Sequence, residues 1–124
     1  MVYVYTGWSE HYHDPDTDQV YYSMAPGLSV DASKYLGDKR IVAIGLDTPF
    51  VDAVADGQLT GKTGPPTGTP EGMPFAIHHH LLTQAGIYLL ENIKLDELAR
   101  DRVSTSCTMI PPLREKGAIG TPRA

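Results

Sequence analysis

The sequence predicts an α/β domain with a mixed sheet built from βαβ units. Short apolar runs rich in β-branched and aromatic residues alternate with segments that carry helix-capping signals. The first two runs are separated by enough chain for one helix, which is the pattern of parallel strands joined by a crossover helix. A chain of 124 residues has the length of one domain. We therefore expect a single domain over residues 1–124.

The first half of the chain is predicted to form a strand, a helix and a second strand. Residues 2–5 (Val-Tyr-Val-Tyr) have the composition of a strand. A helix is expected over residues 29–36, because Ser29 is a suitable N-cap and apolar residues follow at helical spacing. Residues 40–46 form a nearly continuous apolar run, which is typical of a strand buried on both faces.

The second half begins with a long loop. Residues 57–74 contain five glycines and four prolines, so no regular element is expected there. The elements expected after it are a helix over residues 75–84, a strand over 87–90, one or two helical turns over 94–100 and a fourth strand over 104–110. Cys107 lies in the last of these segments, and we expect it to be a small buried residue.

Composition excludes several classes of function. The chain has 15 acidic and 10 basic residues, a net charge of -5, and no run of lysine or arginine, which argues against nucleic-acid binding. No apolar run approaches the roughly 18 residues that span a bilayer. The first residues lack the basic start and apolar stretch of a signal peptide. We expect a cytoplasmic protein without a membrane partner.

Three groups of residues are candidates for chemistry. Three histidines in a row, His78, His79 and His80, point about 100° apart on a helix, so they cannot chelate one ion from one face. One of them is either a ligand with partners elsewhere or part of a solvated helix edge. Glu91 leaves an apolar strand, and a carboxylate there needs a cation, a donor or a metal unless it is exposed. Asp47 follows the strand at 40–46 and is either functional or a turn residue.

Several segments, taken in order along the chain, resemble signatures of the metal-dependent cyclase family, which includes bacterial kynurenine formamidase and isatin hydrolase. The segments are residues 3–9 (Tyr-Val-Tyr-Thr-Gly-Trp-Ser), 26–29 (Pro-Gly-Leu-Ser), 45–49 (Gly-Leu-Asp-Thr-Pro), 79–82 (His-His-Leu-Leu), 85–87 (Ala-Gly-Ile), 89–92 (Leu-Leu-Glu-Asn), 95–98 (Leu-Asp-Glu-Leu) and 120–123 (Gly-Thr-Pro-Arg). The resemblance is to the C-terminal half of the family. The His-x-Gly-Thr-His-x-Asp signature of the first half does not occur in this sequence.

The resemblance implies a set of site residues. In the family the first half supplies histidine and aspartate metal ligands, and the second half adds a histidine and a glutamate about twelve residues apart. That separation selects His79 and Glu91 as the metal ligands of this chain. Asp47 is then expected to support the site from behind the ligands. Trp8 is expected to form an aromatic wall for the substrate.

The resemblance also implies a fold and an activity. The fold would be the C-terminal part of the swivelling β/β/α arrangement of the family. The reaction would be hydrolysis of a formamide or a cyclic amide, assisted by zinc or manganese that two ligands hold weakly. Two alternatives stay open: a non-enzymatic oligomerising or binding module, and one half of a split hydrolase. We expect a homo-oligomer, formed through the apolar face that the first half covers in the family.

Overall fold

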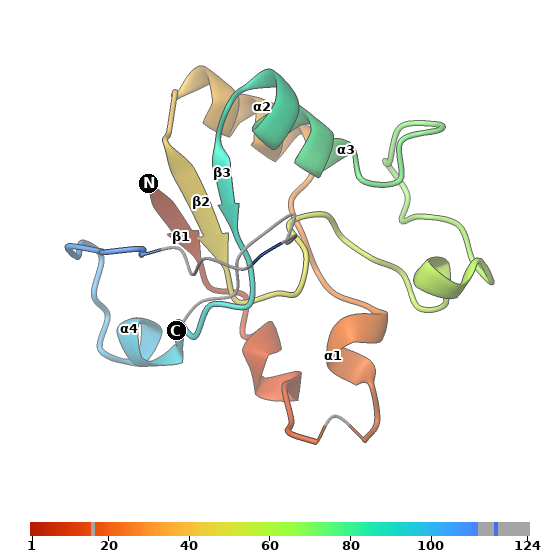
Figure 1. The fold of residues 1–124 in the computed structure, drawn as a ribbon, viewed down its shortest axis with the longest axis horizontal. Helices are drawn as coiled ribbons and strands as arrows, with labels where there is room; N and C mark the ends of the chain where they lie inside the picture. Colours follow the sequence, from red (N-terminus) through yellow and green to blue (C-terminus); the bar gives the residue numbers. More distant parts are fainter. Residues whose placement is uncertain (16, 112–115, 117–124) are drawn as a thin grey trace.

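The computed structural model describes residues 1–15, 17–111 and 116. Its centre is a parallel sheet of three strands in the order β1-β2-β3: β1 (Val2–Val4), β2 (Ala43–Leu46) and β3 (Tyr88–Leu90). Figure 1 shows the three arrows pointing the same way, so their carboxyl ends meet at one edge of the sheet. The predicted α/β class is confirmed. The predicted mixed sheet is wrong for the strands described, because both pairings are parallel.

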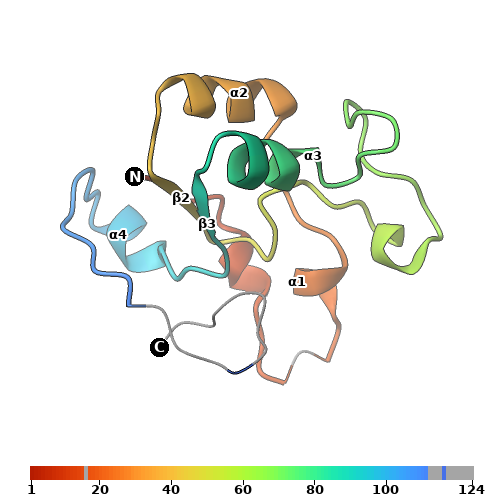
Figure 2. The same cartoon turned by 45° about the horizontal axis from the view of Figure 1, so that its top comes forward.

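Helices and short turns connect and surround the strands. They are η1 (Trp8–His11), α1 (Val20–Ser23), α2 (Val30–Asp38), η2 (Gln58–Thr60), α3 (Ala76–His78), the π-helix η3 (His79–Gln84) and α4 (Asp96–Arg100). Helix α2 contacts both α3 and η3, and Figure 2 shows α2 and α3 lying together beside the sheet. Helix α1 lies beyond the carboxyl ends of the strands (Figure 1). The swivelling arrangement of the cyclase family stays a prediction.

Two of the expected helices form for the reasons that the sequence indicates. The Ser29 hydroxyl accepts a hydrogen bond from the backbone N–H of Ala32 at 3.1 Å, which caps the start of α2. The helix expected over residues 75–84 is present as α3 followed directly by η3. Gly86 follows at a φ of 66°, a left-handed conformation that ends the helical segment before β3.

The hydrophobic core joins β2 to the α3–η3 segment. Its fully buried members are Ile44, Leu46, Val51, Ile77, Leu81 and Ile87. All four residues of β2 are buried, as expected for a central strand covered on both faces. Because Ile77 and Val51 belong to this core, the residues next to them in the chain have fixed positions.

The fourth strand predicted over residues 104–110 is wrong. This segment has no regular secondary structure and is exposed along its length, and Cys107 is exposed rather than buried. Strand propensity requires a half-buried pleated surface to act on, and none of the three strands pairs with this segment. The loop at 57–74 is confirmed as irregular apart from the single turn η2.

Helices in the described part of the chain are all too short or too polar to cross a membrane. The cytoplasmic location stays a prediction. The motif at residues 120–123 lies outside the described residues.

Candidate metal and polar site

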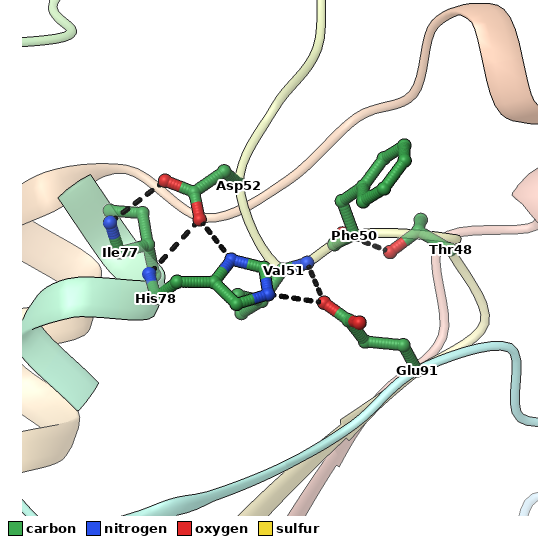
Figure 3. Close-up of polar contacts among 7 residues, drawn as sticks. All are labelled: Thr48, Phe50, Val51, Asp52, Ile77, His78 and Glu91. Carbon is green, nitrogen blue, oxygen red and sulfur yellow. Dashed lines mark hydrogen bonds and ion pairs between the residues drawn. The ribbon is translucent and has the colours of Figure 1, made fainter. Parts of the chain in front are cut away.

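Three polar side chains meet at the carboxyl edge of the sheet. Asp52 lies in the loop after β2, His78 is the last residue of α3, and Glu91 directly follows β3. Figure 3 shows the His78 ring between the two carboxylates, with Asp52 on one side and Glu91 on the other. In open parallel sheets this edge is where ligands bind and catalytic side chains gather.

Both ring nitrogens of His78 are engaged. Nδ1 lies 2.6 Å from Oδ2 of Asp52, and Nε2 lies 3.1 Å from Oε1 of Glu91. The Asp52 side chain is 5% exposed, whereas those of His78 and Glu91 are 31% and 24% exposed. Each carboxylate only accepts when ionised, so a protonated imidazole satisfies both by donating from its two nitrogens.

Backbone donors hold the two carboxylates in place. Asp52 accepts the backbone N–H of Ile77 at 2.8 Å through Oδ1 and that of His78 at 3.0 Å through Oδ2. Glu91 accepts the backbone N–H of Val51 at 2.7 Å through Oε1. All of these partners belong to the core or adjoin it, so the site is attached to the rigid part of the fold.

The loop that carries Asp52 is anchored by a close contact with the chain at Gly27. The backbone N–H of Leu28 donates to the carbonyl of Val51 at 2.9 Å, next to a bridge between Leu28 and Asp52. A Cβ atom at position 27 would lie 2.2 Å from the backbone nitrogen of Ala53. Only glycine allows the two backbones to approach this closely, so Gly27 helps to set the position of Asp52.

The surroundings of His78 favour its charged form. Burial of the imidazole lowers its pKa, but hydrogen bonds to Asp52 and then to Glu91, with the negative charge of both groups, outweigh burial. Together they raise the pKa of His78 from 6.5 to about 9. In the metal-free protein the ring is therefore a cation that bridges two anions at neutral pH.

This charge bridge makes stability depend on pH. Because the pKa of His78 is raised on folding from 6.5 to about 9, its contribution is complete below pH 6.5 and is lost as pH rises through about 9. After discounting for solvent screening of a partly exposed ring, we expect a loss of about 1 kcal/mol in unfolding free energy. Urea unfolding of the metal-free protein at about pH 6 and about pH 9.5 measures it. His78→Gln should remove the difference, and equal pH slopes for both proteins would contradict the bridge.

Asp47 lies at the end of β2 and has a different set of partners. Its carboxylate is fully buried and accepts hydrogen bonds from the Thr6 backbone at 2.8 Å, the Thr6 hydroxyl at 2.8 Å and the Gly7 backbone at 2.9 Å. The Ser9 hydroxyl adds a longer contact at 3.3 Å. None of these partners is His78 or Glu91, and the carboxylate fastens the turn after β1 to β2. The supporting role expected of Asp47 in the metal site stays a prediction.

Trp8 lies at the start of η1, next to this turn. Its indole N–H donates to the backbone carbonyl of Tyr21 at 3.3 Å, and its ring centroid is 4.4 Å from that of His11. Trp8 as a whole is partly buried. Its role as a substrate wall stays a prediction.

The structure places His78, rather than His79, against Glu91. His79 is exposed, with Nε2 at 3.3 Å from the side-chain nitrogen of Gln84, and Nδ1 of His80 lies 2.9 Å from the Gln84 oxygen. The metal ligation expected of His79 stays a prediction. Sequence reasoning included His78 among the three candidate histidines but selected His79, and it missed Asp52, which lies five residues after Asp47 in the same strand-end segment.

The donor pair His78–Glu91 has dimensions that suit a shared metal ion. Two ligands of a tetrahedral zinc ion are about 3.3 Å apart, close to the 3.1 Å between His78 Nε2 and Glu91 Oε1. In the described ranges, however, no group of three or more His, Cys, Asp or Glu residues is placed to hold a metal. Catalytic zinc sites use three protein ligands. The described residues therefore do not complete such a site, and metal binding stays a prediction.

Comparisons with known proteins connect this chain to one family. Residues 1–53 match the family model described as "Putative cyclase". Kynurenine formamidase of Bacillus cereus is 34% identical over 74 residues, which is 60% of this chain and 27% of that protein. The enzymes of the same name from Bacillus mycoides and Bacillus anthracis are 33% and 32% identical over 73 and 74 residues, again 27% of each. No solved structure matches the chain.

These matches cover only part of this chain and a smaller part of the relatives. The aligned part spans about a quarter of the length of the curated relatives. The segment that matches the family model includes Trp8, Asp47 and Asp52 but ends before His78 and Glu91. The resemblance inferred from the sequence motifs is thereby confirmed, while its assignment to the C-terminal half stays a prediction.

Proposed function

We propose, from the confirmed resemblance to the cyclase family, that this chain forms part of a metal-dependent amide hydrolase. His78 and Glu91 hold one divalent ion, zinc or manganese, and the remaining ligands come from another chain. The substrate class is a formamide or a cyclic amide, in keeping with the kynurenine formamidases among the relatives.

The observation that supports this proposal most directly is the convergence of a histidine and a glutamate from two separate elements. His78 Nε2 and Glu91 Oε1 face each other at 3.1 Å at the carboxyl edge of the sheet. Both side chains are partly exposed, so an ion and a substrate have access to them. Imidazole and carboxylate are ligands that suit zinc and manganese.

The residues of this chain would contribute binding and orientation. A bound divalent ion supplies an activated water and polarises the amide carbonyl. Glu91 is held by the Val51 backbone with its Oε1 facing His78 Nε2, and these two atoms would hold the ion. Trp8 is proposed to lie against the aromatic part of the substrate, with its indole fixed through Tyr21.

Zinc affinity tests which histidine is the ligand. We expect the wild-type chain to bind zinc with a dissociation constant below about 1 mM. His78→Ala and Glu91→Gln should each weaken binding at least about tenfold, because each removes one of two ligands. Isothermal titration calorimetry measures both affinity and the number of ions per chain. His13→Ala, at an exposed position, is the matched control.

The outcomes of this titration separate the candidates. Loss of affinity in His79→Ala, with His78→Ala unchanged, would transfer the ligand role to His79. Wild-type binding no tighter than millimolar would contradict the proposal. The reaction itself is tested by incubating the zinc-loaded chain with an aryl formamide and measuring the aryl amine that is released. Zinc binding without hydrolysis would favour the split-hydrolase alternative.

The predicted homo-oligomer is part of this proposal. A cavity of about 620 Å³ lies beside β1, with walls formed by Tyr3, Leu95, Leu98 and Val103 among others. The walls are partly apolar and partly polar, and we place the second copy against their apolar part. If two copies share one ion, the titration should give one zinc per two chains, whereas one zinc per chain would argue against a shared site.

A further inference from the structure

We propose that Asp52 is a positioning residue that fixes the ring of His78 so that Nε2 faces Glu91. This inference rests on the proposed function, in which His78 and Glu91 are metal ligands. Neither the family motifs nor the spacing of the histidines points to Asp52. The evidence for this role is the set of contacts that the Asp52 carboxylate makes in the fold (Figure 3).

Both oxygens of Asp52 are committed to the segment that carries the histidine. Oδ1 accepts the Ile77 N–H at 2.8 Å, and Oδ2 accepts the His78 N–H at 3.0 Å and contacts its Nδ1 at 2.6 Å. The Asp52 side chain is 5% exposed, so water does not replace these partners easily. One buried group thus fixes the backbone of α3 and the ring at its end.

The contact with Nδ1 decides which nitrogen is presented. The χ2 torsion of a histidine side chain has a broad, roughly two-fold preference, so the side chain alone does not select one ring orientation. With Nδ1 on the Asp52 carboxylate, Nε2 is on the opposite edge of the ring and lies 3.1 Å from Glu91. An acceptor at Nδ1 also keeps the proton there and leaves Nε2 to bind a metal.

The neighbouring residue fixes the other member of the pair. The Val51 N–H donates to Glu91 Oε1 at 2.7 Å, and Oε1 is the atom that faces His78. Val51 and Asp52 are adjacent in the loop after β2, and Val51 is fully buried in the core. Two consecutive residues, Val51 and Asp52, therefore set the distance between His78 at the end of α3 and Glu91 after β3.

Asp52→Asn tests this role with little change in shape. The amide nitrogen would donate where the carboxylate accepts, so it would oppose the proton on Nδ1 and place the wrong tautomer toward the ion. We expect zinc affinity to fall about 10- to 100-fold in isothermal titration. In the metal-free protein labelled with ¹⁵N-histidine, the strongly downfield Nδ1 proton resonance of His78 should be lost.

The matched control is Asp31→Asn, which neutralises an exposed carboxylate in the first turn of α2, where Asp31 pairs with Lys34 at 3.9 Å. It should leave zinc affinity and the Nδ1 resonance unchanged. Equal zinc affinity in wild type and Asp52→Asn would overturn the positioning role and leave the proposed function intact. If wild type fails to bind zinc, the proposed function fails, and the Nδ1 resonance still decides whether Asp52 orients the ring: its persistence in Asp52→Asn would overturn the inference.

Discussion

Gly27→Ala should destabilise the protein by about 3 kcal/mol or more, which is among the largest effects of a single methyl group in this fold. The added Cβ would lie 2.2 Å from the Ala53 nitrogen and 2.3 Å from the Asp52 carbonyl carbon. These are backbone atoms, so no rotamer change relieves the clash and the two chain segments must separate. The bridge between Leu28 and Asp52 would be lost with them.

Thermal unfolding followed by circular dichroism measures this effect, and about 3 kcal/mol corresponds to a shift of roughly 10 °C for a domain of this size. Gly64→Ala is the matched control, because a Cβ at Gly64 meets nothing within 4 Å and its φ is not in the left-handed region. A Gly27→Ala protein that melts with wild type would show that residues 27 and 53 are farther apart than described.

Asp47→Ala should destabilise the fold by about 3 kcal/mol, because it leaves several donors without an acceptor. The carboxylate accepts from the backbones of Thr6 and Gly7 and from the Thr6 and Ser9 hydroxyls. Its loss should detach the turn after β1 from β2. Trp8 follows that turn and is the single tryptophan of the chain, so its fluorescence should shift to the red.

Urea unfolding together with Trp8 emission checks this prediction. Ser9→Ala removes only the longer contact, at 3.3 Å, and should cost less than about 1 kcal/mol. An Asp47→Ala protein with wild-type stability and emission would mean that the donors find water without loss, and the turn would then not depend on Asp47.

The local signals in the sequence predict most of the regular elements. Ser29 caps α2 as expected, and the apolar run ending at Leu46 contains the central strand β2. The cap of α2 and the strand β2 depend on residues that are close together in the sequence, so local patterns are enough to predict them. Residues 104–110 show the opposite case, because strand formation there would have required a distant strand edge that the fold does not offer.

The candidate site could be predicted only in part. Glu91 follows from its place at the end of an apolar strand, and a histidine partner follows from the run at residues 78–80. The family spacing selects His79, but which of the three histidines faces Glu91 depends on the rotation of the helix that carries them, and counting residues does not give that rotation. The role of Asp52 depends on a contact between segments 26 residues apart, for which the sequence has no local signal.

The π-helix η3 has a consequence for how this chain should be aligned with others. A π-helical turn accommodates an additional residue compared with an α-helical turn, and η3 lies between His78 and Glu91. His78 stands thirteen residues before Glu91, one more than the separation of twelve that selects His79. A one-residue gap placed within residues 79–84 therefore brings His78 into the column that a gapless alignment gives to His79. An insertion that the helix absorbed as a wider turn would leave the position facing Glu91 to His78, and mutagenesis chosen by counting alone would target its neighbour.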